Sequence, residues 1–495
     1  MSNDFLRNKK KFSFLASIYD FCQKNCYQLG VYIVVVGAGE VGYYITRLLT
    51  DPKHQTQNME VAIVDSDSDR IAKLDGELDA AMVEGSGSHP ESLQLAGIKK
   101  ADLLVAVSSS DEVNLIAGQY AKNQGVKKTI VRIEADEIKA EQGKDSWFLG
   151  ADEPDLIFDP DQDTANEIYS LLDSWGADEI ATLAEGKIVM IGITLNSDAD
   201  FCGKTLSEIG KLYEPDWSFL VAALRRDGET KVPRSEETLQ DGDHIWLVIK
   251  RSEKSNVLET LGFKSKKQKR ILLLGGGRTA EFLAKKLVKK KFREVTLIES
   301  NPKRAKKLAA RLDGVDVVRG DITDAQFLSS EIDAGKYDAA IALTGKDEAN
   351  ALACMYAKSL GTDRTMAIIH RLKLLDVLGS AGVDSALSPV TASANRVLRF
   401  VHEVEDVATF LGTDQNFEVV ELRVEEGSKA TTSEIKDMKF PRDALVGALV
   451  RNGEPAIARC RSQLLPDDLV ILIAPPEQVD SIRKEYFLTV DSSSE

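Results

Sequence analysis

Short apolar runs alternate with amphipathic stretches in two separate regions of the chain. In the first region the runs are rich in valine and isoleucine and are bounded by glycine, aspartate or serine, which favours buried strands. The predicted strands are 33–36, 61–64, 103–107 and 129–133, and the predicted helices between them are 72–79, 91–96 and 113–123. Alternation of strands and helices predicts an α/β domain with a parallel sheet and right-handed crossovers.

A different pattern follows this region. Three short strands are predicted at 187–195, 217–225 and 244–250, separated by glycine-containing turns rather than by regular helices. This pattern is typical of a small, compact α+β domain. A helix with an acidic start, directly after Pro160 and ending near residue 172, joins the two patterns, and residues 389–400 take the same place later in the chain.

The chain repeats itself, in the same order and at a nearly constant offset. The matched segments are 31–42 with 270–280, 61–65 with 295–299, 83–86 with 318–321, 111–114 with 347–350, and, in the smaller part, 226–229 with 451–454 and 239–248 with 464–473. Such internal duplication predicts two copies of one two-part unit. The fold class that follows is α/β, with two Rossmann-like parallel-sheet domains, each followed by a small α+β domain.

The repeat also sets the expected domain boundaries. They are a basic N-terminal extension (1–30), a first Rossmann-like domain (31–160), a connecting helix (161–182), a first small domain (183–263), a second Rossmann-like domain (264–400), a second small domain (401–487) and a tail (488–495).

The composition excludes some classes of function but says little about the fold. Hydrophobic residues make up 43% and charged residues 29% of the chain, which is ordinary for a globular protein, and no apolar run reaches the roughly 18 residues of a membrane span. The net charge of −16 argues against a nucleic-acid binder, which usually carries a basic face. Five scattered cysteines fit a reducing cytosol, and no histidine cluster indicates a metal site.

The first thirty residues differ from the rest, because lysine and arginine outnumber acidic residues there. Their apolar part, 12–19, is too short for a signal peptide and is interrupted by Asp20. We expect a loosely docked amphipathic tail, with a weak contact to an anionic membrane surface or a membrane partner as the alternative. The basic segment 264–270 is expected to be a solvated connector.

The glycines after the first strand predict a nucleotide site. Gly37 permits a tight turn, Gly39 lets the backbone approach a pyrophosphate, and Gly42 lets helix and strand pack closely. The phosphates would then lie on the N–H groups at the helix start. Asp65 ends the second strand, where a carboxylate holds the ribose hydroxyls. The other candidate residues of this site are Ala38, Glu40, Val41, Ser66, Arg70, Gly85, Ser86 and Ser108.

The second copy predicts a weaker site of the same kind. Its glycine loop ends in alanine rather than glycine, and Arg278 and Thr279 are placed where they could contact a phosphate. Glu299 takes the position of the ribose-binding aspartate. A scaffold that has kept the fold without the ligand is the alternative. The candidate residues are Gly275, Gly276, Gly277, Arg278, Thr279, Glu299, Gly320 and Asp321.

These motifs resemble a known family. The glycine loop 37–42 with Asp65, the segment 96–102 and the segment 111–114 are similar to the regulator-of-potassium-conductance (RCK) domain, and the motifs at 226–228 and 241–243 are similar to its C-terminal partner. The resemblance covers residues 31–485. Ser86 departs from it, because related proteins often carry an aspartate there, whereas the second copy keeps Asp321.

Two such pairs in one chain are similar to the regulators of Trk-type potassium uptake. The resemblance implies a cytoplasmic protein, peripheral on the inner face of the cell membrane, that docks on a membrane potassium channel or transporter subunit. It also implies binding of NAD(H) and of ATP or ADP, and a homotetramer whose eight nucleotide domains form a ring.

Two alternatives stand beside this hypothesis. An NAD-dependent oxidoreductase needs a proton donor or base over the nicotinamide, and the best candidates, His89 and His370, stand alone in loops. We therefore expect a non-enzymatic sensor without catalytic residues. A regulator of another monovalent cation transporter, such as a potassium/proton antiporter, would use the same domains.

Overall fold

The computed structural model describes most of the chain. The described residues are 31–51, 59–142, 153–174, 176–197, 199–214, 217–262, 268–290, 293–375, 378, 382–403, 407–411 and 417–489. The predictions for the N-terminal extension, for most of the basic connector and for the last tail residues lie outside them. In the described part, no helix combines the length and the apolar character needed to cross a membrane.

The first Rossmann-like unit is a six-stranded parallel sheet in the order β3-β2-β1-β4-β5-β6. Its strands are β1 Val31–Val36, β2 Met59–Asp65, β3 Ala81–Glu84, β4 Leu103–Ala106, β5 Lys128–Arg132 and β6 Leu156–Phe158. Its helices are α2 Glu40–Thr50, α3 Ser68–Leu74, α4 Pro90–Leu95, α5 Asp111–Asn123 and the short α6 Asp136–Lys139. The central strands are apolar along their whole length because helices cover both faces of the sheet.

The second Rossmann-like unit repeats this sheet, in the order β14-β13-β12-β15-β16-β17. Its strands are β12 Arg270–Leu274, β13 Glu294–Glu299, β14 Val315–Arg319, β15 Ala339–Ala342, β16 Arg364–Ile368 and β17 Ser385–Leu387. The helices include α10 Arg278–Leu287, α11 Pro302–Arg311 and α12 Asp347–Ser359. A short π-helix, η5 Phe327–Glu331, stands where the first unit has α4.

Each small unit is a five-stranded antiparallel sheet with short helices. The first has the order β10-β9-β11-β8-β7 and the second the order β18-β19-β22-β20-β21. The first contains β7 Glu179–Leu183, β8 Ile188–Thr194, β9 Phe219–Arg226, β10 Glu229–Lys231, β11 His244–Lys250, α8 Leu206–Leu212 and α9 Lys254–Thr260. The second contains β18 Val407–Leu411, β19 Glu418–Arg423, β20 Leu445–Arg451, β21 Glu454–Ile457, β22 Leu469–Ala474 and α15 Pro476–Ile482.

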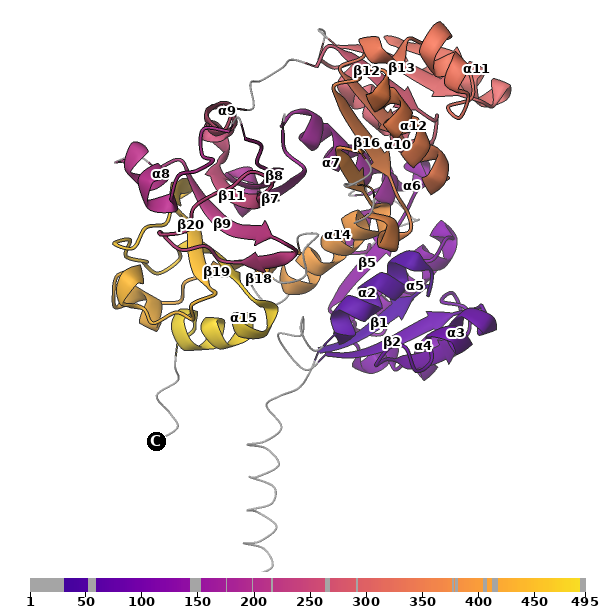
Figure 1. Ribbon diagram of the computed structural model, residues 1–495. Helices are drawn as coiled ribbons and strands as arrows, with labels where there is room; N and C mark the ends of the chain where they lie inside the picture. Colours follow the sequence, from indigo (N-terminus) through magenta and orange to yellow (C-terminus); the bar gives the residue numbers. More distant parts are fainter. Residues whose placement is uncertain are drawn as a thin grey trace, which may run out of the picture.

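The two small sheets pack against each other. They lie together on one side of the molecule, and the two Rossmann-like units lie on the other side (Figure 1). Their shared core includes Trp246 from one sheet and Phe417 from the other, with ring centroids 5.0 Å apart. The arginine–aspartate motif of each repeat is structural, because Arg226 pairs with Asp243 at 2.7 Å just as Arg451 pairs with Asp468 at 2.7 Å.

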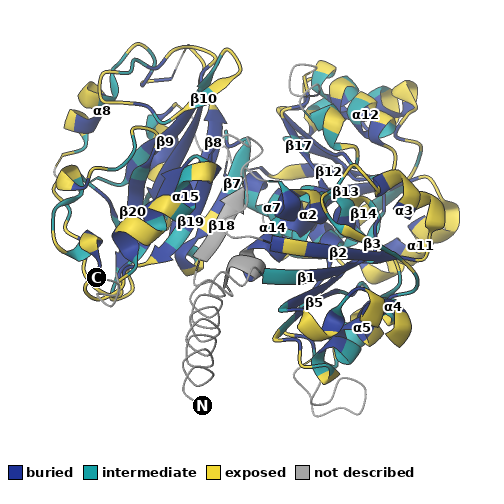
Figure 2. Ribbon diagram, turned by 90° about the horizontal axis from the view of Figure 1, so that it is seen from below, coloured by how far each residue is buried: buried dark blue, intermediate teal, exposed yellow. Residues whose placement is uncertain are grey.

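The two halves exchange their connecting helices. Helix α7 (Pro160–Leu172) leaves the first Rossmann-like unit and packs on α10 of the second unit, while α14 (Pro389–Glu403) leaves the second unit and packs on α2 of the first. Figure 2 shows α7, α14 and α2 together at the centre of the molecule, largely buried. We call these the α7 contact and the α14 contact. Through these two contacts, the glycine loops of both units border the same cavity.

The predicted strand–helix alternation is confirmed in both halves, as are helices directly after Pro160 and at 389–400. The first connecting segment, expected at 161–182, is helical only to Leu172, and β7 of the small sheet begins at Glu179. One element was misplaced. The helix expected at 72–79 is α3, Ser68–Leu74, because the Asp67 side chain accepts the backbone N–H of Arg70 and so begins the helix earlier. Residues 75–80 form a turn instead.

Candidate functional site

The first glycine loop has the geometry of an anion cradle. Gly37 lies at φ +101°, and a Cβ there would stand 2.7 Å from the backbone nitrogen of Ser108. A Cβ at Gly42 would stand 1.8 Å from the carbonyl oxygen of Gly37, so helix α2 can approach the loop only without a side chain there. At Gly39 the same test finds nothing within 4 Å. The loop is therefore tight behind Gly39 and open in front of it.

Helix α2 begins at this open side. Its N-cap residue is Gly39, which has no side chain to accept the first N–H groups of the helix. The helix dipole adds positive potential at the same place. A phosphate or another anion in front of Gly39 would satisfy these N–H groups.

Asp65 stands beside the loop, at the end of β2. One of its carboxylate oxygens accepts the backbone N–H of Ala38 at 2.6 Å, and the other accepts that of Asp67 at 2.9 Å. The Arg70 guanidinium lies 3.1 Å from the same carboxylate and 3.4 Å from that of Asp67. Oδ2 thus accepts from both Ala38 and Arg70, whereas Oδ1 accepts only from Asp67 and keeps a lone pair that can accept a hydroxyl from a ligand.

A cavity of about 630 Å³ opens in front of the loop and is lined by both Rossmann-like units. From the first unit the lining includes the predicted residues Gly37, Gly39, Glu40, Val41, Asp65, Ser66, Arg70, Gly85, Ser86 and Ser108. From the second unit it includes Gly277, Arg278, Thr279, Thr344, Gly345 and His370, and Pro389 and Val390 come from the start of α14. A volume of this size suits a small-molecule ligand.

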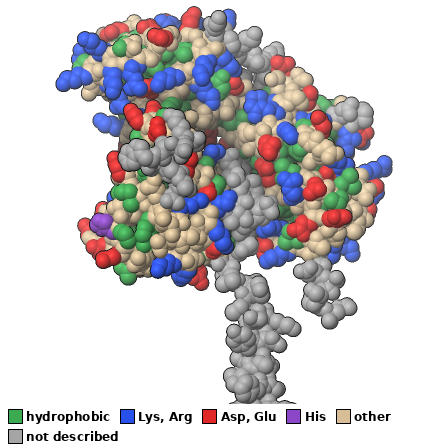
Figure 3. Space-filling model, turned by 180° about the vertical axis from the view of Figure 1, so that it is seen from behind, with side chains coloured by type: hydrophobic (Ala, Val, Ile, Leu, Met, Phe, Trp, Pro, Cys, Tyr) green, Lys and Arg blue, Asp and Glu red, His purple; other side chains and the backbone are tan. Residues whose placement is uncertain are grey.

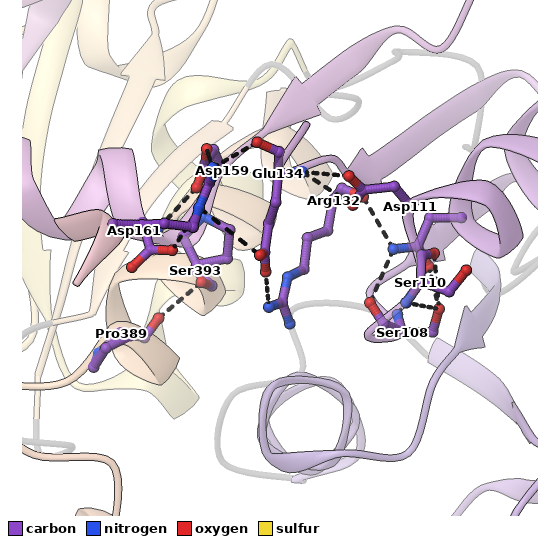
Figure 4. A network of polar contacts seen from close by, with 12 residues as sticks. Ser108, Ser110, Asp111, Arg132, Glu134, Asp159, Asp161, Pro389 and Ser393 are labelled. Atoms are coloured by element: carbon purple, nitrogen blue, oxygen red, sulfur yellow. Dashed lines mark hydrogen bonds and ion pairs between the residues drawn. The ribbon is translucent and has the colours of Figure 1, made fainter. Parts of the chain in front are cut away.

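Arg132 is a cationic residue of this cavity that the sequence did not single out. It ends β5, and its guanidinium pairs with Glu134. Figure 4 shows this pair between the serines of the β4–α5 loop and the aspartates at the start of α7. The signal that could have found it is positional, because ligands of parallel sheets bind at the carboxyl ends of the strands.

The repeated segments 111–114 and 347–350 hold the strand ends in place. Asn114 is fully buried; its side chain accepts the Ser108 N–H at 2.9 Å and donates to the carbonyls of Ser108 and Arg132. Asn350 makes the equivalent contacts in the second unit. The two buried asparagines therefore fix the backbone at the carboxyl ends of the strands that border the cavity.

The second glycine loop has the same backbone but different surroundings. Gly275 lies at φ +107°, and Glu299 accepts the N–H of Gly276 at 3.1 Å, as Asp65 does for Ala38. The Arg278 guanidinium, however, pairs with Asp159 at 2.7 Å and with Asp161 at 3.2 Å. Gly275, Gly276, Glu299, Gly320 and Asp321 are not part of the described cavity lining.

The remaining candidates lie apart. Asp321 accepts the backbone N–H and the hydroxyl of Thr323, which lowers its pKa, and so serves a local turn. His89 begins α4 outside the described cavity lining, whereas His370 lines the cavity with its ring 2.9 Å from the carboxylate of Asp347. In the described residues, no group of three histidine, cysteine or acidic side chains is placed to hold a metal ion.

The face of the molecule seen from behind carries both signs of charge. Figure 3 shows acidic and basic side chains mixed over the face seen from behind, with lysine and arginine gathered over the upper part of the molecule. The exposed helix α11 contributes Lys303, Arg304, Lys306 and Lys307.

Two Rossmann-like units with exchanged helices, each followed by a small antiparallel unit, define the class of the protein as a duplicated RCK assembly. The TrkA-N domain family matches residues 33–153 and 271–389, and the TrkA-C domain family matches residues 190–262 and 419–486. The chain therefore belongs to the TrkA family.

Relatives and solved structures agree with this assignment. The chain is 32% identical to a Trk system potassium uptake protein TrkA homolog from Archaeoglobus fulgidus, over 92% of this chain and 99% of that protein. It is 31% identical to the Trk system potassium uptake protein TrkA of Vibrio alginolyticus, over 93% and 98%. The GsuK RCK domain, with 17% identity, has a TM-score of 0.57 and covers 92% of this chain and 95% of its own. The GsuK channel bound to NAD, with 18% identity, has a TM-score of 0.58 over 92% and 79%.

Proposed function

We propose that the first Rossmann-like unit binds an adenine nucleotide, NAD(H), ATP or ADP, in the 630 Å³ cavity. The observation that carries the proposal is the uncapped start of α2, which faces open space at Gly39 and has Asp65 beside it. The phosphates would accept the N–H groups of the helix start, and Asp65 would accept a ribose hydroxyl. Arg132 and Ser108 line the same space and would complete the site, whereas Arg278, which also lines it, is paired with Asp159 and Asp161.

The carboxylate of Asp65 also argues for the type of nucleotide. A free 2′-hydroxyl can donate to it, whereas a 2′-phosphate would be repelled, which favours NAD(H) or ATP over NADP. Arg70 does not reverse this preference, because it is already paired with Asp65 and Asp67.

We further propose that the chain is a cytoplasmic regulatory subunit of a Trk-type potassium uptake system, without enzymatic activity of its own. The support is membership of the TrkA family and the names of relatives that match over nearly their whole length. A homotetramer docked on the inner face of the membrane, against the transporter subunit, is the assembly that the family resemblance implies.

The cavity suggests how the signal would pass. Both Rossmann-like units line it, and so does the start of α14. A ligand moves an equilibrium only by its different affinity for two shapes. A nucleotide in this cavity would favour one placement of the two units over another, and a coupling of about 1–3 kcal/mol would change transport several-fold.

A calorimetric titration of the full chain with NAD, NADH, ATP and ADP tests the binding site. Gly39→Asp should abolish binding, because its carboxylate would stand where the phosphates are proposed. The variant should fold normally, since Gly39 has φ −69° and open space at the Cβ position. A Gly39→Asp chain that melts like the wild type and binds nucleotide normally would show that the site is wrong.

Co-expression with a Trk-type membrane subunit tests the regulatory role. Rubidium uptake by cells should depend on the chain, and the Gly39→Asp variant should no longer respond to nucleotide supply. Capture of a potassium/proton antiporter instead of a Trk subunit would favour that alternative. Steady nicotinamide turnover that is lost in His370→Ala would contradict a purely regulatory role.

A further inference from the structure

The two exchanged contacts are equivalent in position but not in chemistry. In the α7 contact, Asp159, Pro160 and Asp161 lie at the start of α7 and meet the start of α10. In the α14 contact, the equivalent segment is Ser388-Pro389-Val390, which meets the start of α2. Asp161 of the first half thus corresponds to Val390 of the second.

An internal carboxylate lies at the start of α10. The Asp161 carboxylate accepts the hydroxyl of Thr279 and lies 3.2 Å from the Arg278 guanidinium. Asp159, whose side chain is 1% exposed, pairs with the same guanidinium at 2.7 Å. The residues that the sequence placed against a phosphate are therefore bonded to the chain's own acids. The α10 dipole favours this arrangement, because it attracts negative charge to the first turn.

No such acid faces the start of α2 from α14. Val390 is buried against apolar neighbours that include Val41, and both residues line the cavity. Asp161 lines the same cavity, but its carboxylate is engaged by Thr279 and Arg278. The α10 start therefore has an internal anion, whereas the α2 start has none from α14.

The two units also differ in the side chain that packs behind the glycine after the third strand. A Cβ added to Gly320 would stand 2.1 Å from the ring of Phe327, and one added to Gly85 would stand 2.2 Å from the hydroxyl of Ser92. Beside the second glycine loop, Leu308 and Glu299 lie within 2.7 Å of a Cβ added to Gly276. The neighbour of the glycine after the third strand is therefore an aromatic ring in the second unit and a hydroxyl group in the first.

We propose that each chain binds one nucleotide, in the first unit, and that Asp161 permanently occupies the phosphate position of the second unit. This inference rests on the proposed nucleotide site of the first unit. It states that only this one of the two Rossmann-like units binds a nucleotide. It also gives the two contacts different roles. The α7 contact holds the halves together whether or not nucleotide is present, and the α14 contact, which borders the open cavity, is the one that nucleotide changes.

The stoichiometry of ADP binding to the full chain tests this directly. We expect one ADP per chain, and none for Gly39→Asp. Two ADP per chain, or one ADP retained by Gly39→Asp, would overturn the inference, because the second unit would then hold a nucleotide. A wild-type chain that binds neither ADP nor NAD contradicts the proposed function itself and is distinguishable from both of those results.

Moving the carboxylate from one contact to the other tests the role of Asp161. Val390→Asp copies it into the α14 contact and should weaken ADP binding about tenfold or more, because a buried negative charge would face the phosphates. Val390→Asn has the same size without the charge and should bind ADP about tenfold more tightly than the aspartate variant. If both variants bind ADP equally, a carboxylate at this position does not exclude a phosphate and the inference fails.

Discussion

Arg364 offers the sharpest test of how α7 is held on the second unit. It begins β16, is 5% exposed, and donates to the backbone carbonyls of Leu171 at 2.8 Å, of Ser174 at 3.4 Å and of Ala177. These carbonyls lie at or just after the C-terminal end of α7, where a cation also complements the helix dipole. Arg364→Met keeps much of the volume and removes all three bonds.

The expected cost can be worked from these contacts. A hydrogen bond to a charged group contributes about 1.5–3 kcal/mol, but removing the arginine also removes the penalty of burying its charge. We therefore expect a net loss of about 3 kcal/mol in the stability of the α7 contact, since the three carbonyls lose their donor. Because about 1.4 kcal/mol is a factor of ten, amide hydrogen exchange near the end of α7 should accelerate about 100-fold.

The first unit offers a matched control at the equivalent position. Lys128 begins β5, and its ammonium lies 4.9 Å from the ring centroid of Phe400 on α14. Such a cation–π contact is worth about 0.5–1 kcal/mol, so Lys128→Met should accelerate exchange in α14 by less than about tenfold. Equal effects of the two variants, or unchanged exchange in α7 of Arg364→Met, would refute the assignment of Arg364 as the anchor of α7.

Three further outcomes follow from particular contacts. Asn114→Ala should lower the free energy of unfolding by about 2–4 kcal/mol in urea denaturation, because three backbone groups lose a buried partner; a loss below about 1 kcal/mol contradicts this. Gly42→Ala should lower both the melting temperature and nucleotide affinity, because its Cβ meets the Gly37 carbonyl at 1.8 Å. Burial raises the pKa of Asp178 to about 6, although the hydrogen bond from Thr194 acts in the opposite direction. The protonated carboxyl group therefore stabilises the fold fully below about pH 4, and this stabilisation is lost as the pH rises through 6. Asp178→Asn should therefore be more stable than the wild type at pH 8, by about 1–2 kcal/mol for a side chain that is 32% exposed, with no difference at pH 4.

The local parts of the fold were predictable because local chemistry determines them. Valine- and isoleucine-rich runs give the central strands, and the glycines at 37 and 42 are required by a positive φ and by a close contact, respectively. The error at 72–79 has the same origin, because the capping side chain of Asp67 was overlooked. These features need only neighbours in sequence.

The exchange of α7 and α14 was not predictable, because it depends on contacts between residues far apart in the chain. Arg278 lies more than a hundred positions from its partners Asp159 and Asp161. From sequence alone, an arginine after a glycine loop suggests a phosphate partner, and only the fold shows that an internal acid takes that place. For the same reason Arg132 could be placed at a strand end but not in a cavity shared by two units.

Duplication makes this divergence informative. Each contact joins a helix that follows a glycine loop to a connecting helix that begins with proline. Because this arrangement is the same in both contacts, it does not explain why only one of them would respond to nucleotide. One difference lies in the side chains at the helix start, where Asp161 in one copy corresponds to Val390 in the other. A fixed charge satisfied inside the protein gains nothing from an external anion, whereas an apolar neighbour leaves the α2 start unsatisfied until an anion arrives. If the first unit binds nucleotide as proposed, the difference between Asp161 and Val390 gives a physical reason why only that copy would respond to it.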